Sequence, residues 1–451
     1  MISPSKIPLA WSKKKLQEVL RFQKGKKPLF LTEEEDASLL PYIDIDAFEN
    51  LHFKQFTDGI KATLCFPEDV VIVWDGARCG LVGAGVHGAL GSTLGRLTSE
   101  SISSRYLLYF LNMNYELINK NPRGTGLPHV NPEIFWNIEI SFPSFSEQEN
   151  IVAKLEAILT QINPSRAALG RIPALLKAFR QSVLAAAFRG ELTERDASDE
   201  PALMLLERIR AERRNKWEEN LRTKGKHPAN FTYEEPAAPD TSNLPELPQG
   251  WVWTILQNLA GVHSGVTKGR DLSRFETIDV PYLRVANVQA GFLDLGEVKS
   301  ISIKPDELDH YRLLKNDVLY TEGGDRDKLG RGTVWKSEID PCIHQNHIFC
   351  ARLYLLDLSP EWVSMTGQLE YARDYVNSVA SQSVNLASIN STNLKAMPIP
   401  LPPIQEQLRI VQKIKVLYGQ MNDVEIAVKT ASHRLDMLEQ AALSRAFRGE
   451  L

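Results

Sequence analysis

The chain has 451 residues, of which 43% are hydrophobic and 24% are charged, and its formal net charge is −4. At roughly 100 to 200 residues per domain, this composition indicates a globular protein of a few domains, and it excludes a fibrous, a disordered or a uniformly basic chain. Four scattered cysteines argue against a disulfide framework, and no apolar run is long enough for a signal peptide or a membrane span. We therefore expect a cytoplasmic protein.

One passage of the sequence occurs twice at a constant offset. AFRGEL stands at 187–192 and again at 446–451, and the match extends upstream, where FPSFSEQENIVAKLEAI from Phe142 aligns with LPPIQEQLRIVQKIKVL from Leu401, 259 residues later. A period this long indicates two copies of a whole domain rather than a solenoid of small repeats. In the front parts of the two halves the offset is 240, which pairs Trp11 with Trp251, Gly25 with Gly265, and Pro41 with Pro281.

Two globular heads are expected, over residues 1–142 and 245–400. Both contain short β-rich runs, such as VVIVW at 70–74 and VPYLRVANV at 280–288, which are separated by glycine-rich turns. We predict that each head is a mixed α/β domain, which gives the chain an α+β fold class.

A long amphipathic helix is expected after each head, over residues 143–192 and 401–451. In the second copy, apolar residues recur with a mean step of about 3.5 residues, which is the coiled-coil period. In the first copy, Pro164 and Pro173 interrupt the same pattern. They predict a kink near Asn163, or a break at which Asn163 caps a new helix.

An apolar stripe of this length needs a partner of equal length, and the other copy provides one. Two similar halves related by a pseudo-two-fold axis would place the helices antiparallel as a coiled coil, with one head at each end. The residues expected in this helix-pair interface are Ile151, Leu155, Ile158, Leu169, Leu176, Phe179, Leu408, Val411, Ile414, Met421, Val428, Leu435 and Leu438.

The segment between the halves, residues 193–244, has a different character. Its first part is rich in charged residues and predicts another helix, and its second part is a proline-rich linker that leads into the second head.

Motifs that carry chemistry are weak. GAGVHG at 83–88 has the spacing of a dinucleotide fingerprint but lacks the βαβ context, so a glycine-rich turn between strands is the better interpretation. Cys342, His344, His347 and Cys350 could ligate zinc, although core cysteines and strand histidines explain them better. Motifs for ATP binding and for adenine methylation are absent, and no catalytic residue and no metal site is expected.

The duplicated helical passages carry a family resemblance. The pattern P-x-x-x-EQ, then IVxKLEAI, then LKAFRQSVLAAAFRGEL resembles the specificity subunit of type I restriction-modification systems. The resemblance covers the whole chain and includes DVVIVWDGARCGLVG and DVLYTEGGDRDKLGRG in the heads.

This resemblance implies that each head is a target recognition domain that reads one half of a bipartite double-stranded DNA sequence. The helices would set the spacing and dock two methyltransferase subunits, and two restriction subunits with motor and nuclease activity would join for cleavage. S-adenosylmethionine, ATP and Mg would be bound by these partners, and none by this chain. AFRGEL and the turns at Glu147 and Glu406 would be duplicated because the same partner docks at two equivalent places.

Two other functions stay open at this point. A coiled-coil scaffold with protein-binding heads predicts no salt-sensitive DNA binding, and an enzyme with an unrecognised site predicts turnover by the isolated chain.

The candidate DNA contacts are cations in loops with turn-forming glycines. Arginine can bridge guanine with two hydrogen bonds, whereas lysine more often contacts phosphate. The candidates are Lys24, Lys26, Lys27, Arg78, Arg123, Lys268, Arg270, Arg326, Lys328 and Arg331.

Overall fold

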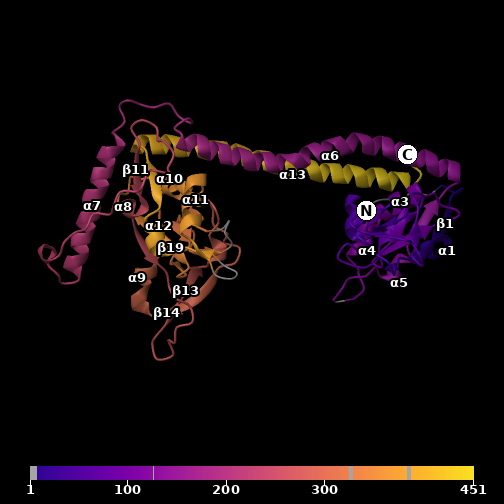
Figure 1. Ribbon diagram of the computed structural model, residues 1–451, viewed down its shortest axis with the longest axis horizontal. Helices are drawn as coiled ribbons and strands as arrows, with labels where there is room; N and C mark the ends of the chain where they lie inside the picture. The colour runs from indigo at the N-terminus through magenta and orange to yellow at the C-terminus, as the bar shows by residue number, and fades with distance from the viewer. Residues whose placement is uncertain (1–7, 125, 325–328, 383–386) are drawn as a thin grey trace. The chain divides into compact units, whose positions relative to one another are not determined.

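The computed structural model describes residues 8–124, 126–324, 329–382 and 387–451. The chain forms two compact units, of which the first is discontinuous in sequence and the second is continuous, and neither unit coincides with one half of the duplication. The first unit contains the chain up to Ile172 together with Glu425–Leu451, and the second is Pro173–Val424. Each unit therefore combines one head with segments of both long helices (Figure 1).

The first unit is built on short strands and helices that precede the first long helix, α6 (Phe145–Phe188). These elements are β1 (Ser12–Lys15), α1 (Leu16–Val19), β2 (Arg21–Lys24), β3 (Leu40–Ile43), α2 (Ile45–Asn50), β4 (Phe56–Thr57), β5 (Leu64–Cys65), β6 (Val70–Val73), β7 (Val82–Ala84), β8 (Gly88–Leu90), β9 (Leu94–Thr98), α3 (Ser104–Met113), α4 (Tyr115–Asn119), α5 (Pro132–Phe135) and β10 (Glu139–Phe142).

The second unit begins in α6 and ends in α13 (Ile404–Ala446). Between them lie α7 (Ala202–Thr223), η1 (Pro228–Asn230), β11 (Val252–Ile255), α8 (Leu256–Leu259), β12 (Ala260–Ser264), β13 (Ile278–Leu283), η2 (Val285–Asn287), β14 (Lys299–Ile303), η3 (Pro305–Glu307), α9 (Leu308–Tyr311), β15 (Val318–Thr321), β16 (Gly323–Gly324), β17 (Gly332–Val334), β18 (Ile343–His344), β19 (Ile348–Leu353), α10 (Pro360–Thr366), α11 (Glu370–Val379), β20 (Ser381–Gln382), β21 (Ala387–Ser388), α12 (Ser391–Lys395) and β22 (Pro398–Leu401).

The two heads share the strand order of one sheet and a parallel strand pair in a second, although their sequences differ. A four-stranded antiparallel sheet has the order β2-β9-β6-β7 in the first head and β12-β19-β15-β17 in the second. A second sheet contains a parallel pair, β3 with β8 in one head and β13 with β18 in the other. Each head also has a separate two-stranded antiparallel ribbon, formed by β1 and β10 in the first head and by β11 and β22 in the second. The second strand of each ribbon directly precedes the long helix.

The sequence offsets are reproduced by the elements themselves. β1 and β11 begin 240 residues apart, at Ser12 and Val252, whereas α6 and α13 begin 259 residues apart, at Phe145 and Ile404. The second head therefore holds 19 more residues than the first between these elements. The duplication predicted from the sequence is confirmed.

The first long helix is not broken at its prolines. α6 continues through Pro164 and Pro173, so the predicted alternative of a break with Asn163 as a cap is wrong. Both proline side chains are exposed. The helical hydrogen bonds that they remove are lost on the exposed side, where water can replace them.

The long helices run antiparallel to each other within the first unit. Arg166 on α6 contacts Asp436 at 3.0 Å and Glu439 at 2.6 Å on α13. Ile151, earlier on α6, belongs to the same core cluster as Phe447, which lies beyond these acids. In the second unit, the last turns of α6 likewise share a core cluster with the first turns of α13.

Three residues of the predicted helix interface are misplaced. Phe179, Leu408 and Leu438 have exposed fractions of 48%, 47% and 57%, whereas the other ten are buried or half-buried. Buried and half-buried positions of α13 recur at alternate steps of four and three residues, and several of them are polar. The prediction considers apolar residues only. Where the buried position is polar, it therefore selects an exposed apolar neighbour instead. These recurring positions are Gln407, Val411, Ile414, Tyr418, Met421, Glu425, Val428, Ser432, Leu435, Glu439, Ala442 and Ala446.

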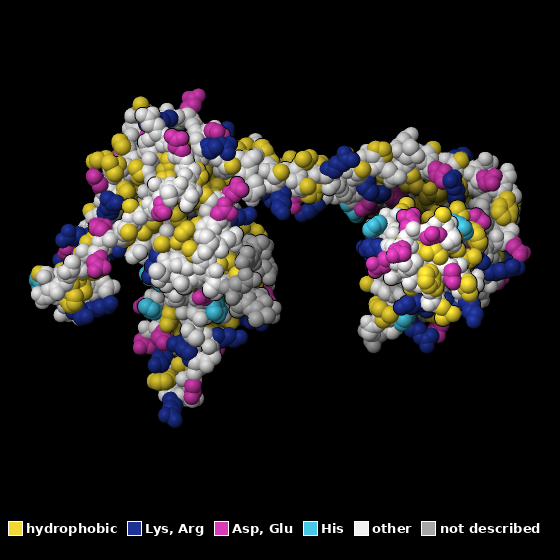
Figure 2. Space-filling view, viewed as in Figure 1, with side chains coloured by type: hydrophobic (Ala, Val, Ile, Leu, Met, Phe, Trp, Pro, Cys, Tyr) yellow, Lys and Arg dark blue, Asp and Glu magenta, His cyan; other side chains and the backbone are white. Residues whose placement is uncertain are grey.

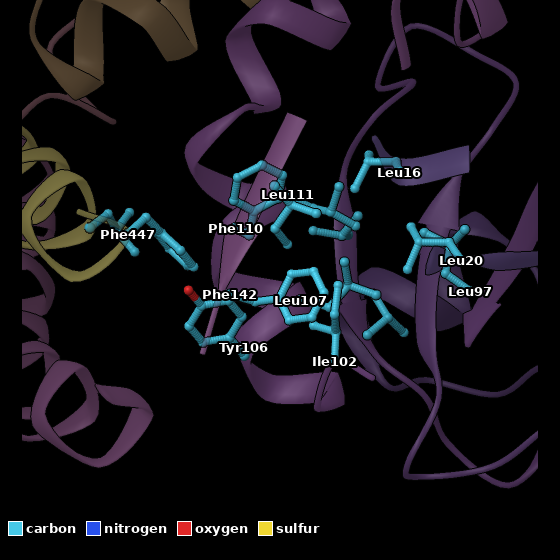
Figure 3. Packing of buried hydrophobic residues seen from close by; sticks show 14 of the residues in the cluster. Leu16, Leu20, Leu97, Ile102, Tyr106, Leu107, Phe110, Leu111, Phe142 and Phe447 are labelled. Atoms are coloured by element: carbon cyan, nitrogen blue, oxygen red, sulfur yellow. The ribbon is translucent and has the colours of Figure 1, made fainter. Parts of the chain in front are cut away.

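The two AFRGEL passages anchor the long helices to the heads. The ring of Phe447 lies 4.8 Å from that of Tyr106 and 5.4 Å from that of Phe110, inside the core of the first head (Figure 3). In the second unit the ring of Phe188 stacks on that of Trp362 at 4.3 Å. Each helix thus ends on the head that the other half of the sequence encodes.

A tight turn follows each of these phenylalanines. Gly190 and Gly449 have φ angles of +70° and +73°, and a Cβ atom on them would lie 3.0 Å from Pro248 and 2.7 Å from Pro8. The repeated passage is therefore an internal anchor. Its phenylalanine and glycine contact the chain itself, and the docking of a partner at AFRGEL stays a prediction.

The duplicated EQ dipeptides have internal partners as well. The indole of Trp11 donates to Glu147 at 3.3 Å, and that of Trp251 donates to Glu406 at 3.0 Å. The following glutamines are buried, and their side chains donate to the carbonyl groups of Pro143 and Pro402. These residues join each long helix to its own head, and a partner site at the turns of Glu147 and Glu406 stays a prediction.

Replacing Glu406 with glutamine should stabilise the second unit at pH 8. Burial raises the pKa of Glu406 above its ordinary value. The carboxyl group therefore favours folding at low pH, and this contribution is lost as the pH rises through the folded-state pKa. Glutamine can still accept the Trp251 hydrogen bond without a charge. Thermal unfolding at pH 8 and pH 5 should show a gain that shrinks at the lower pH, and a less stable variant at pH 8 would contradict this account.

Candidate nucleic-acid interface

Three loops of the first head that carry candidate cations lie against one another. Asp75, which follows β6 and is 8% exposed, is 2.7 Å from the Lys24 ammonium group and 2.7 Å from the His129 ring. Backbone hydrogen bonds of 2.9 and 3.0 Å join Arg123 to His129. The structure thus brings together the end of β2, the loop after β6 and the hairpin that contains Arg123.

A second contact braces the loop after β6 against the segment after β3. Arg78 forms an ion pair with Glu49 on α2. In the second head Arg331 donates to Gln289 at 2.9 Å, and this contact joins the loop after β15 to the segment after β13. Glu49 and Gln289 differ by 240 positions, so the same site of the duplicated framework accepts the arginine in both heads. These two arginines hold loops in place in addition to any contact with DNA.

In the loop after β12, one of the candidate cations also has an internal acidic partner. Arg270 makes two hydrogen bonds to Glu307, of 2.6 and 3.0 Å, and its guanidinium group clamps the loop to η3. The carboxylate of Glu307 raises the pKa of Arg270. A cavity of about 400 Å³ lies between this loop and β14.

An aromatic residue of this loop was not predicted from the sequence. Phe275 is 53% exposed, and the ammonium group of Lys304 lies 3.7 Å from the centre of its ring. Basic and aromatic residues stand together in DLSRFE, which is the available signal for such a contact. Phe275 and Lys304 therefore join the candidate interface of the second head.

Four candidate cations are available to a ligand. Lys26, Lys27, Arg123 and Lys268 are exposed, and their side chains make no hydrogen bond or ion pair within the described part of the chain. Arg326 and Lys328 lie outside the described residues. Figure 2 shows cationic and acidic side chains interspersed on the visible face, which therefore does not form one uniform basic surface.

A buried contact fixes the start of the cation-bearing loop in both heads. A Cβ atom on Gly25 would lie 2.1 Å from the carbonyl oxygen of Gly91, and one on Gly265 would lie 2.0 Å from that of His344. Only glycine allows this approach of two backbones. The framework pair Gly25 and Gly265 therefore explains why the two loops leave their sheets at equivalent points.

The weak chemical motifs are parts of the fold. The glycines of 83–88 lie in and between β7 and β8, which confirms the turn between strands. Cys342 and Cys350 belong to a core cluster, and His344 is buried in β18. His347 lies in a turn and pairs with Glu322 at 2.5 Å.

No group of three or more His, Cys, Asp or Glu side chains among the described residues is arranged to hold a metal ion. No helix in this part of the chain is both long and apolar enough to cross a membrane.

Comparisons with known proteins agree with the duplicated architecture. Residues 8–168 and 248–429 each match the family described as the type I restriction modification DNA specificity domain. The type I restriction enzyme EcoKI specificity subunit of Escherichia coli (strain K12) is 26% identical over 396 residues, which are 85% of this chain and 75% of that protein. The StySPI specificity subunit of Salmonella potsdam is 27% identical over 396 residues, with the same coverage.

A solved structure has the same fold. It comes from a study of complex assembly and conformational transition of the type I R-M system, and its TM-score is 0.67 at 20% sequence identity. The similarity covers 99% of this chain and 100% of that chain. The family match spans most of the sequence in two copies, and the heads that contain those copies have equivalent sheets and braces. The chain therefore belongs to the family of type I restriction-modification DNA specificity subunits and carries the specificity domain twice.

Proposed function

We propose that this chain is a non-catalytic recognition subunit in which each head reads one half of a bipartite double-stranded DNA target. The observation that carries the proposal is the duplicated specificity domain, whose two copies share a framework and differ in their loops. The loop after β2 carries Lys26 and Lys27, whereas the equivalent loop after β12 carries Lys268 and Arg270. Loops that differ on equal frameworks support recognition of two unlike half-sites.

The loop residues divide into two roles in this proposal. Exposed cations without an internal partner contact phosphates, which gives affinity in any sequence. The braced loops that contain Arg78 and Arg331 are held against neighbouring segments, and this restraint suits groups that must meet base edges at fixed positions.

The reactions of the complex belong to its partners in this proposal. Two methyltransferase subunits dock on the paired helices and bring S-adenosylmethionine, and two restriction subunits bring ATP and Mg. The paired helices set the distance between the half-sites. The four cysteines of this chain are free and buried. They fit the reducing cytoplasm, where we place the protein.

Co-expression with the neighbouring operon products, followed by genome-wide mapping of methyladenine, tests the proposal. We expect two unlike half-sites separated by a fixed gap. A scaffold would give no salt-sensitive DNA binding and no methylation that depends on this chain. Turnover by the isolated chain would instead show that it is an enzyme.

Lys268→Ala should weaken DNA binding by a similar factor for all sequences. Lys268 is exposed and has no internal partner, so it is available to one phosphate. The slope of log affinity against log salt should decrease by about 1. Binding titrations between 50 and 200 mM salt measure this slope. Lys415→Ala is the control, because Lys415 pairs with Glu361 at 2.7 Å on the long helix and its loss should leave the slope unchanged.

Arg331→Ala should relax specificity in one half-site only. Arg331 joins the loop after β15 to Gln289, and its loss should cost on the order of 1 to 3 kcal/mol against the correct target. Arg326→Ala carries the same expectation. Methylation mapping should show degeneracy in the half-site read by the second head. Gln289→Ala should reproduce the effect if bracing is the cause, whereas uniform weakening across sequences would assign Arg331 to phosphate.

A further inference from the structure

The second unit contains a large groove that the DNA-reading loops do not use. A cavity of about 1310 Å³ lies between the linker at 237–247 and a face formed by β11, β22 and α11. Its floor is apolar and aromatic, with Trp253, Tyr371, Pro398 and Pro400 among the lining residues. Such a surface suits apolar side chains of a partner.

The groove has an acidic rim. Asp240, Glu246, Glu370 and Asp374 line it and are exposed, and within the described residues none of them takes part in an ion pair. Arg189, which also lines the groove, makes two hydrogen bonds to Glu191 of 2.7 and 2.6 Å. The rim therefore presents negative charge that the chain itself does not neutralise.

The groove thus combines an apolar floor and an acidic rim. Tyr371 contributes its ring to the floor, because its hydroxyl oxygen is buried and makes no hydrogen bond in the described structure.

The corresponding face of the first unit has the opposite character. By the offsets of 240 and 259, Trp253 corresponds to Lys13, and Pro398 corresponds to Glu139. Lys13 and Glu139 form an ion pair of 2.7 Å on this face. The shared fold of the two heads therefore does not require the apolar and acidic side chains of this groove.

We propose that this groove docks a basic amphipathic helix of another polypeptide. Apolar side chains of that helix cover Trp253 and Tyr371, and its lysines or arginines meet the four carboxylates of the rim. DNA does not fit, because the rim repels phosphate. This inference rests on the proposed function in one respect, which is that the polypeptide belongs to a methyltransferase subunit of the complex.

One consequence is that the two methyltransferase positions are unequal. The helix docks on the acidic groove of the second unit, whereas the corresponding face of the first unit has Lys13 and Glu139, paired with each other, in place of Trp253 and Pro398 and lacks the apolar floor. The second unit therefore binds its methyltransferase subunit more tightly than the first does.

Charge reversal tests the proposal in the purified complex. Glu370→Lys combined with Asp374→Lys should weaken the tighter of the two binding steps for the methyltransferase subunit at least tenfold, as measured by mass photometry at 150 mM salt. Glu338→Lys combined with Asp309→Lys is the matched control, because these exposed acids lie outside the groove in the same unit. Equal assembly of the two double variants would overturn the proposal.

A second measurement does not depend on how the charge variants fold. A photo-crosslinking amino acid in place of Ser378, which lines the groove, should join a lysine- or arginine-rich segment of the methyltransferase subunit. Cross-links only to the chain's own linker, or only to a second copy of the chain, would overturn the proposal. If the wild-type chain neither assembles nor directs methylation, the proposed function fails. If it does both and the groove variants match their controls, only the docking site fails.

Discussion

Phe447→Asp should unfold the first unit and leave the second unit folded. Phe447 is 7% exposed, and its ring packs on those of Tyr106 and Phe110 in the core of the first head. The change removes this packing and buries a charge without a partner, which together cost more than about 4 kcal/mol. Hydrogen exchange read by mass spectrometry should show loss of protection in residues of the first unit alone.

Two other variants make this experiment specific. Phe188→Asp should produce the reverse pattern, because Phe188 packs on Trp362 in the second unit. Met437→Asp should change little, because Met437 lies on the same helix as Phe447 with an exposed fraction of 59%. Loss of protection in both units of the Phe447 variant would show that they unfold together, and unchanged protection would show that the anchor is dispensable.

Adding one heptad to both long helices should lengthen the gap between the half-sites. Insertion after Ile172 on α6 and after Ala431 on α13 places the two additions at the same level, because Arg166 faces Asp436 and Glu439 in the antiparallel pair. Seven residues add roughly 10 Å, which corresponds to about three base pairs. Methylation mapping should return the same two half-sites with a longer gap.

Occupancy should fall even at the best new site. Three base pairs rotate the second half-site by about 100°, whereas a helix drifts by only about 20° per heptad, so the heads cannot follow the rotation fully. An unchanged gap at full occupancy would show that the helices do not set the spacing. A heptad added to α6 alone serves as the control, because it shifts the last turns of α6, with Val183 and Leu184, out of register with Ile414 on α13 and should abolish assembly.

The framework could be predicted from the sequence because duplication leaves local traces. Two constant offsets identified equivalent residues, and the structure places Gly25 and Gly265 at the same backbone contact in both heads. The long helices were recognisable because their period persists over more than forty residues. The glycine pattern at 83–88 was interpreted correctly as a turn, because no helix of a βαβ unit follows it.

The exchange of anchors between the halves could not be predicted. Phe188 and Phe447 stand in identical passages, and a linear pattern does not reveal which head each one contacts. Leu408 was misplaced for a related reason, since its neighbour Gln407 is the buried residue that faces inward. A polar side chain is buried here because it finds hydrogen bonds in the folded structure, and these are not visible in a hydrophobic pattern.

The candidate interface was predictable only as a set of loops. The sequence shows cations beside glycines in these loops. It does not show that Arg78 and Arg270 have internal acidic partners, because those acids lie 29 and 37 residues away in the sequence. Phe275 was missed because a single exposed aromatic residue has no periodic pattern. Long-range pairing therefore decides which cations are free to meet DNA, and the sequence does not contain that pairing in a local form.

The exchanged anchors have a consequence for the order in which the protein can mature on the ribosome. The core of the first head includes Leu443, Ala446 and Phe447, which are synthesised about 300 residues after Phe142 ends the head's own sequence. During that interval the apolar surface around Tyr106 and Phe110 lacks the cover that Phe447 gives it in the folded chain. The head translated first is therefore the unit completed last, and it is the one that must be shielded from aggregation while the rest of the chain is made.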